Sequence, residues 1–170
     1  PRFFAHTGPL PSPLLPHMVI HMDTPLILAS GSAIRAQMLR NAGLAFETEV
    51  ARIDEDSIKD ALRAEDASPR DIADTLAEMK ARKIADKRPE AMVIGCDQVL
   101  AFEGTLLSKP RDPADATAQL TVMRGQRHSL FSAVVIYHEG KPIWRHVGHV
   151  RLRMRDVSDQ YLAAYISRNW

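Results

Sequence analysis

Residues 26–39, LILASGSAIRAQML, constrain the fold of this chain more than any other stretch. A four-residue apolar run is followed by Ser-Gly-Ser and then by an amphipathic segment with an arginine one turn in. This order predicts a buried strand that leads through a short loop into the first turn of a helix. Such a connection is typical of proteins in which strands and helices alternate.

The same loop has the composition of an anion-binding site. Free backbone N–H groups and the positive dipole end at a helix start favour phosphate or carboxylate. Gly31 lets the backbone approach an anion closely, Ser30 and Ser32 add hydroxyl groups, and the Arg35 guanidinium matches phosphate oxygens. An ordinary capping turn would use the same residues, and the loop alone does not decide between the two. The common phosphate-loop and dinucleotide fingerprints, G-x-x-x-x-G-K-[ST] and G-x-G-x-x-G, are both absent from the sequence.

Composition narrows the class of protein. The chain has 170 residues, 45% hydrophobic and 25% charged, which suits one globular domain with a real core. Its 22 basic and 21 acidic residues leave a net charge of +1, which argues against a general binder of nucleic acid or of membrane surfaces. The single cysteine, Cys96, excludes an internal disulfide and four-cysteine zinc sites. We expect it to pack as a small apolar side chain in a cytoplasmic protein.

The first 24 residues differ from the rest of the chain. They lack the long apolar run of a signal peptide, and repeated prolines exclude a continuous helix or a membrane span. We therefore expect residues 1–24 to be a Pro-rich extension outside the core, and residues 25–170 to form the domain.

The remaining sequence predicts further strands and helices in alternation. We expect a strand within 44–53, a helix over 69–87 that begins after Ser68, a buried strand at 91–96, a hairpin turn at 102–105, a helix over 113–123, long strands at 127–138 and 142–156, and a last helix from 159 to 166. This order predicts an α/β fold with a mixed central sheet flanked by helices.

Four charged residues are candidates for chemistry. Asp97 follows the strand expected at 91–96, so its carboxylate would lie at the mouth of the sheet, where ligands of α/β proteins usually bind. Bracing the next turn is its alternative role. Lys109 is a positive charge suited to phosphate, Lys80 belongs to a predicted helix, and Glu55 could hold a hard cation. Solvated surface positions are the default interpretation for these three.

Two further patterns on the predicted strand 142–156 favour structural roles. His146 and His149 are three residues apart, so they point to opposite faces of a strand and cannot share a metal without a bulge. Arg151, Arg153 and Arg155 alternate with apolar residues on one face. A solvated face is favoured over a nucleic-acid groove there, because interleaved aromatic residues are absent from that stretch.

Six segments, taken in order, resemble the Maf (septum formation protein) family of nucleoside triphosphate pyrophosphatases. They are LASGSAIR, IDE, EMKARK, IGCDQV, LSKP and RGQRHSLFSAV, and they span essentially residues 25–168. The resemblance implies an inosine-triphosphatase-like (Maf-like) architecture. It also implies hydrolysis between the α and β phosphates to a nucleoside monophosphate and pyrophosphate, with Mg²⁺ or another divalent cation.

The resemblance also implies roles for particular residues. Its substrate-binding set corresponds here to Ser30, Gly31, Ser32, Arg35, Glu55, Lys80 and Lys109. Asp97 corresponds to the presumed catalytic base; whether it acts as base, metal ligand or both stays open, and Glu55 is the second metal candidate. The implied partner is a nucleoside triphosphate, with neither nucleic acid nor membrane expected. A homodimer is compatible with the resemblance, since family members often dimerise.

Three departures from the family pattern concern specificity and completeness. Ala33 and Ile34 replace the usual proline and first arginine. Gln98 resembles the branch that acts on 7-methyl-GTP, but that branch typically has tryptophan at the place of Ile34, so Ile34 and Gln98 leave 7-methyl-GTP, UTP, dTTP and CTP all open. Family members also continue beyond the position of Trp170, so we expect this chain to lack a C-terminal segment. The alternative to an enzyme is a non-catalytic nucleotide-binding or cell-division regulatory module.

Overall fold

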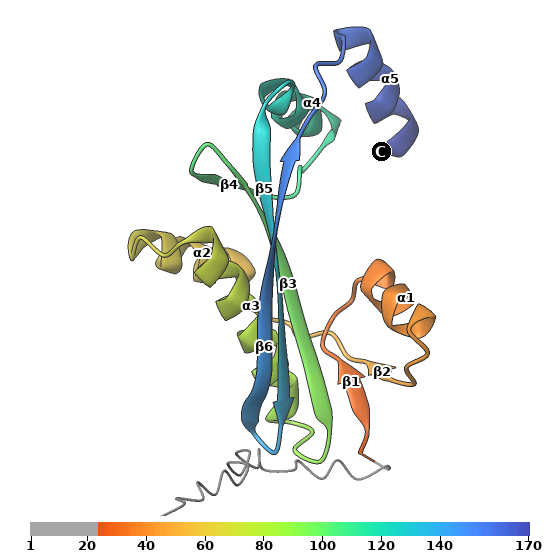
Figure 1. The fold of residues 1–170 in the computed structure, drawn as a ribbon, viewed down its shortest axis with the longest axis vertical. Coiled ribbons are helices and arrows are strands. Elements are labelled where there is room, and N and C mark those ends of the chain that lie inside the picture. The colour runs from red at the N-terminus through yellow and green to blue at the C-terminus, as the bar shows by residue number, and fades with distance from the viewer. Residues whose placement is uncertain (1–23) are drawn as a thin grey trace, which may run out of the picture.

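The computed structural model describes residues 24–170, so the prediction for the Pro-rich extension lies almost entirely outside the described residues. Five helices and six strands follow in chain order (Figure 1). They are β1 (Leu26–Leu28), α1 (Ala33–Asn41), β2 (Glu47–Thr48), α2 (Glu55–Ala64), α3 (Pro69–Ala85), β3 (Met92–Phe102), β4 (Thr105–Leu107), α4 (Pro113–Met123), β5 (Arg127–His138), β6 (Lys141–Arg153) and α5 (Asp159–Asn169). Within this part of the chain, no helix combines the length and apolarity that crossing a membrane requires.

The strands form one mixed sheet, which confirms the predicted fold class. Its order is β2-β1-β3-β5-β6, with β4 paired to β3. The pairs β1–β2 and β1–β3 are parallel, whereas β3–β4, β3–β5 and β5–β6 are antiparallel. The long strands β3, β5 and β6 make up the body of the sheet. The short strands β1 and β4 pair with the edge of β3 that faces away from β5, and β2 pairs with β1.

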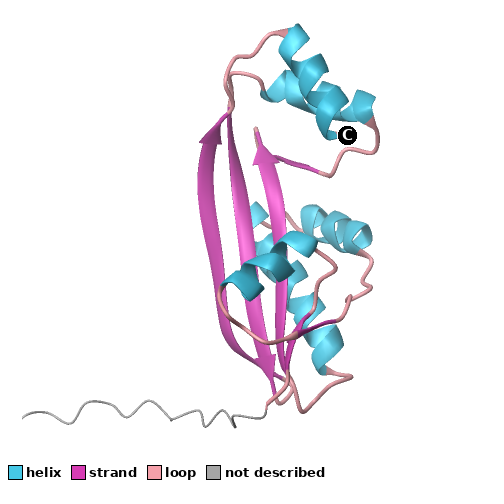
Figure 2. Cartoon of the chain, turned by 90° about the vertical axis from the view of Figure 1, so that its right-hand side faces the viewer, coloured by secondary structure: helices cyan, strands magenta, loops and turns pink. Residues whose placement is uncertain are grey.

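Helices cover both faces of this sheet. Helix α3 buries Ile72, Leu76 and Ile84 against the β3–β5 surface that contains Val93 and Val135. On the opposite face, α1 packs through a small buried cluster of Leu28, Ala36 and Cys96. Figures 1 and 2 show α3 and α1 on opposite sides of the strands, with α4 and α5 together beyond one end. Cys96 is a buried free cysteine, as predicted.

Local capping explains why several predicted helix starts are confirmed. The hydroxyl of Ser68 accepts a hydrogen bond from the Asp71 backbone N–H, and Pro69 occupies the first turn. Ser158 caps α5 in the same way. The Ser32 hydroxyl caps α1, which confirms the strand-loop-helix reading of residues 26–39. Serine before a helical segment therefore marked these boundaries reliably.

Three predicted strands need correction, and one helix was not predicted. The strand expected within 44–53 is only Glu47–Thr48, and the strand expected at 142–156 is Lys141–Arg153. The acidic residues 54–56 begin the unpredicted helix α2, because the Asp54 carboxylate accepts the Ser57 N–H and caps it. The strand predicted to end at 96 continues to Phe102, because β5 pairs with it from Val93 to Ala101. Asp97 therefore lies in the middle of β3 and not just beyond its end.

Candidate active site

A break in the sheet beside β3 exposes the middle of this strand. One edge of β3 pairs with β1 at Met92–Ile94 and with β4 at Leu100–Phe102. Between these two segments, residues 95–99 have no strand partner on that edge within the described chain, although β5 pairs with them on the other edge. Asp97 and Gln98 lie in this interval, so the sheet itself is interrupted where the predicted chemistry is centred.

A cleft of about 780 Å³ opens at this break. Its walls come from β3, from β4 and the loop after it, from α2 and the residues just before it, and from one residue each of α1, α3, α4 and β5. The charged and amide side chains among them are Arg35, Asp54, Glu55, Asp56, Lys59, Arg63, Lys80, Asp97, Gln98, Lys109 and Gln119.

The ammonium group of Lys80 joins two carboxylates in this cleft. Its Nζ lies 2.6 Å from Asp97 Oδ1 and 2.7 Å from Glu55 Oε1. Lys80 is only 8% exposed and Asp97 is also buried. A solvated position for Lys80, the default from the sequence, is therefore wrong: the residue lies on the buried face of α3 and its charge is compensated by β3 and α2.

These contacts keep opposite charges side by side at neutral pH. Burial acts to lower the pKa of Lys80, but hydrogen bonds and charges from Asp97 and Glu55 outweigh it and raise the pKa above its usual value. Burial acts to raise the pKa of Glu55, but Lys80, with the charges of Lys59 and Lys109, lowers it below its usual value. Both groups of this pair are therefore ionised across the neutral range.

Gly95 makes the contact between α3 and β3 close enough for this bridge. A Cβ at this position would lie 2.2 Å from the Ala77 carbonyl oxygen and 2.5 Å from the Ala81 nitrogen, both in the backbone of α3. Only glycine fits such an approach. Since Lys80 lies between Ala77 and Ala81, the close approach brings its side chain to Asp97.

The Ser-Gly-Ser loop is fastened to β3 next to Asp97. Arg35 Nη1 donates a hydrogen bond of 3.0 Å to the Cys96 carbonyl oxygen and one of 3.4 Å to Ser30 Oγ. Ser30 Oγ also accepts the Ser32 N–H at 3.2 Å. Arg35 lines the cleft, whereas Ser30 is buried behind it. The loop thus supplies a helix N-terminus and a guanidinium beside the break in the sheet.

The comparison with known families decides the assignment. Residues 25–170 match the family described as Maf-like protein. This chain belongs to the Maf family.

Several relatives of this Maf protein have names that describe a pyrophosphatase activity. A nucleoside triphosphate pyrophosphatase of Ruegeria pomeroyi is 66% identical over 149 residues, which are 88% of this chain and 75% of the relative. A 7-methyl-GTP pyrophosphatase of Brucella abortus is 42% identical over 147 residues, 86% of this chain and 74% of the relative. Among solved structures, a nucleoside-triphosphatase (dITP/XTP pyrophosphatase) of Mycobacterium abscessus aligns with a TM-score of 0.42 and 14% identity, over 85% of this chain and 94% of that one. The family assignment rests on the sequence matches.

The Maf cleft gathers most, but not all, of the predicted site residues. Arg35, Glu55, Lys80, Asp97, Gln98 and Lys109 line it. Gln98 Nε2 donates a 2.7 Å hydrogen bond to Ser132 Oγ, which orients its amide. Ser30, Gly31, Ser32 and Ile34 are not among the lining residues, and Ile34 is 71% exposed on the surface of α1.

The sequence analysis did not identify two cationic residues of α2, Lys59 and Arg63, as members of the site. Lys59 and Arg63 line the cleft together with Glu55. The three residues are spaced by four, so they lie on one face of the helix. That spacing was the available signal, but it goes unnoticed if residues 54–56 are taken for a surface run and not for the start of a helix.

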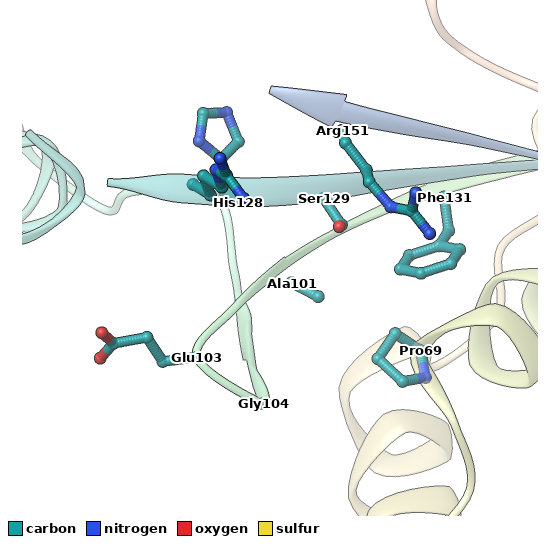
Figure 3. Close-up of a pocket in the computed structure, with 9 residues that line it drawn as sticks. Pro69, Ala101, Glu103, Gly104, His128, Ser129, Phe131 and Arg151 are labelled. Carbon is teal, nitrogen blue, oxygen red and sulfur yellow. The ribbon is translucent and has the colours of Figure 1, made fainter. Parts of the chain in front are cut away.

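The other candidates lie apart from the Maf cleft. A smaller cavity of about 280 Å³ near the start of α3 contains Ser129, Phe131 and Arg151 and shares no lining residue with the cleft (Figure 3). His149 stacks on Phe131 with ring centroids 4.3 Å apart, while His146 stacks on Trp144. Residues 24–170 contain no group of three or more His, Cys, Asp or Glu side chains arranged to hold a metal.

Proposed function

We propose that this Maf protein is a hydrolase that cleaves the phosphoanhydride bond between the α and β phosphates of a nucleoside triphosphate. The names of its relatives and its family membership support the reaction class. The observation that carries the assignment to this cleft is the buried Lys80 ammonium between Asp97 and Glu55, at an interruption of the sheet. A pair of acids and several cations are what a phosphate-transfer site requires.

The charges of the cleft fit the course of this reaction. Attack of water on the α phosphorus forms a P–O bond, breaks the bond to the bridging oxygen and releases pyrophosphate with the electron pair of that bond. Negative charge grows on the phosphate oxygens and the leaving group, and we assign Arg35, Lys80 and Lys109, which line the cleft, to offset it. Asp97 accepts a hydrogen bond from Lys80 through Oδ1, and we assign its carboxylate to orient the water and take its proton.

The acids of the cleft also fit a divalent cation. Mg²⁺ prefers oxygen ligands and is usually held by one or two carboxylates together with substrate phosphates. Asp97 and Glu55 contact the same ammonium group, so they are close enough to share such a role with the substrate. When bound, the cation would supply charge stabilisation at the phosphates.

The identity of the nucleotide base is a separate proposal. The relative from Brucella abortus is named a 7-methyl-GTP pyrophosphatase, and Gln98 lines the cleft as an amide able to donate and accept hydrogen bonds. Ile34, the other specificity candidate, is exposed on α1 and is not among the residues that line the cleft. We propose a modified or non-standard nucleotide as substrate, with 7-methyl-GTP and the pyrimidine triphosphates UTP, dTTP and CTP as candidates.

Pyrophosphate release tests this function. The chain is incubated with Mg²⁺ and 7-methyl-GTP, UTP, dTTP, CTP or GTP, and products are separated to show monophosphate and pyrophosphate. The variant Asp97→Asn should lose about 10²- to 10⁴-fold in kcat, the contribution of a general base, while it still binds the nucleotide. Absence of turnover across the panel would reject the enzyme and favour a nucleotide-binding module. Release of inorganic phosphate in place of pyrophosphate would reject cleavage at the α phosphorus.

A further inference from the structure

Helix α2 presents a row of charged side chains to the cleft. Glu55, Lys59 and Arg63 are spaced by four residues and all three line the cavity. Glu55 belongs to the bridge with Lys80, whereas Lys59 and Arg63 have no role in the chemistry described above. Both cations line the cleft and are therefore candidates for contact with an anion bound in it.

The Lys59 ammonium lies near two carboxylates of α2 but donates a hydrogen bond to neither. Its side chain is 18% exposed, and its Nζ lies 3.7 Å from Glu55 Oε2 and 3.7 Å from Asp56 Oδ1. Both distances are ion-pair contacts beyond hydrogen-bond length. Since no hydrogen bond from this ammonium is found among residues 24–170, its N–H donors can turn to an anion in the cleft.

Arg63 lies where the two walls of the cleft meet. Its Nη1 donates to Asp60 Oδ1 at 3.1 Å, and its Nη2 reaches the Leu106 carbonyl oxygen of β4 at 3.5 Å. Lys109 follows β4 and lines the same cleft. The Arg63 guanidinium thus reaches from α2 to β4. An anion between these two elements would meet Arg63 and Lys109 together.

The apolar and the cationic side chains that line the cleft come from different elements. Strands β3, β4 and β5 contribute the apolar residues Val99, Leu100, Leu106, Leu107 and Leu130. All five cations of the lining come from the helices and from the loop after β4. An alternating chain of charges, Asp97 to Lys80 to Glu55 to Lys59, leads from the proposed reacting centre onto α2. A base suits the apolar part, and phosphates beyond the α phosphorus suit the α2 side.

We infer that Lys59 and Arg63 bind the β and γ phosphates of the substrate and hold the pyrophosphate as it leaves. This inference rests on the proposed function, because it takes the α phosphorus to react beside Asp97. It gives α2 a role of its own, as the wall that recognises the length and charge of the phosphate tail. Both side chains would act on the leaving group directly and not through Asp97.

A purely structural role of Lys59 predicts a different binding result. If Lys59 served only to hold Glu55 toward Lys80, its loss would weaken every ligand of the cleft alike. If it binds the distal phosphates, pyrophosphate and triphosphate lose affinity while a nucleoside monophosphate does not. Comparing pyrophosphate with UMP therefore separates the two roles.

The test is calorimetric titration of pyrophosphate and of UMP, with Mg²⁺, into the unmodified chain and into Lys59→Gln and Arg63→Gln. Each variant should bind pyrophosphate about tenfold or more weakly, as expected for the loss of a hydrogen bond between charged groups. Binding of UMP should stay within about twofold. Lys59→Arg should keep most of the pyrophosphate affinity. The matched controls are Lys87→Gln and Arg82→Gln, whose side chains are exposed and outside the cleft lining; both should bind like the unmodified chain.

The titrations can contradict the inference in three ways. Equal pyrophosphate affinity in all variants overturns the inference, as does a lack of pyrophosphate binding by the unmodified chain. A parallel loss of pyrophosphate and UMP binding also overturns it, in favour of the structural role. Failure of the proposed function would be visible separately, as no turnover of any triphosphate by the unmodified chain, because pyrophosphate binding is measured without turnover.

Discussion

Lys80 is the residue on which the cleft depends most. Its ammonium compensates Asp97, which is buried in the middle of a strand, and Glu55, which begins a helix on another wall. A buried carboxylate without such a partner is strongly unfavourable. Lys80 thus has a structural task in addition to the proposed stabilisation of phosphate charge.

Replacing Lys80 by methionine should therefore lower both activity and stability. The Lys80→Met side chain fills a similar volume but leaves Asp97 buried and uncompensated. We expect the free energy of unfolding at pH 7 to fall by about 3 kcal/mol. Urea denaturation followed by circular dichroism measures this change, and pyrophosphate release measures the accompanying loss of turnover.

The double variant Lys80→Met/Asp97→Asn provides the control. Removing the second charge relieves the unpaired carboxylate, so the double variant should be at least about 1 kcal/mol more stable than Lys80→Met alone. Additive destabilisation by the two changes would contradict a direct pairing of Lys80 with Asp97.

At the level of elements, the site depends on how closely α3 packs on β3. Gly95 leaves no room for a side chain between the two backbones. Protein interiors transmit such local strain because they are tightly packed. A single methyl group two residues from Asp97 should consequently disturb the contact between Lys80 and Asp97.

The variant Gly95→Ala tests this packing. The added Cβ meets backbone atoms of α3, which cannot turn aside, so the helix must move away and carry Lys80 from Asp97. We expect a loss of about 2 kcal/mol or more in the free energy of unfolding. Turnover should fall at least about tenfold, because small misplacements of catalytic groups reduce rates strongly.

Gly148→Ala is the matched control for this change. Gly148 also lies in a long strand, but a Cβ there would have its nearest neighbour, the Ser132 carbonyl oxygen, at 3.8 Å, which is ordinary contact. We expect little change in stability or turnover. Equal effects of the two substitutions would show that loss of glycine in a strand, and not the approach of α3, is responsible.

The whole molecule brings together segments that are distant in sequence, and this limits what the sequence alone can predict. Helices α3, α4 and α5 were foreseen because their caps and apolar periods are local. The extension of β3 past Asp97 depends on pairing with Ser129–Ser132 of β5, which is distant in the sequence, and the polar side chain of Asp97 made the strand look finished. The burial of Lys80 depends on Gly95, and nothing local in the sequence reveals that close approach. Family resemblance named the site residues, but only the fold relates them in space.

A second network of charges joins α3 to β6. Arg145 donates hydrogen bonds to Asp74 at 2.8 Å and to Glu78 at 2.7 Å, and the Tyr137 hydroxyl donates to Glu78 at 2.8 Å. Burial acts to raise the pKa of Glu78, but the hydrogen bonds from Tyr137 and Arg145 and the charge of Arg145 lower it below the usual value of 4.5. The network therefore fastens the last long strand to the helix that carries Lys80.

This network should make stability depend on acid. A carboxyl group whose folded pKa is below its unfolded value stabilises the fold above the unfolded value, and this contribution is lost as the pH falls through the folded pKa. The variant Arg145→Gln should thus be about 1 kcal/mol less stable than the unmodified chain at pH 7, where the ion pairs are complete. Its deficit should shrink as the pH falls below 4.5, because protonation of Glu78 removes the same interaction from the unmodified chain. Urea denaturation of both proteins from pH 7 downward measures the difference.

Lys141→Gln, an exposed change on the same strand, should show no such dependence. A deficit of Arg145→Gln that stays constant with pH would mean that packing of the arginine stem, and not its charge, joins β6 to α3.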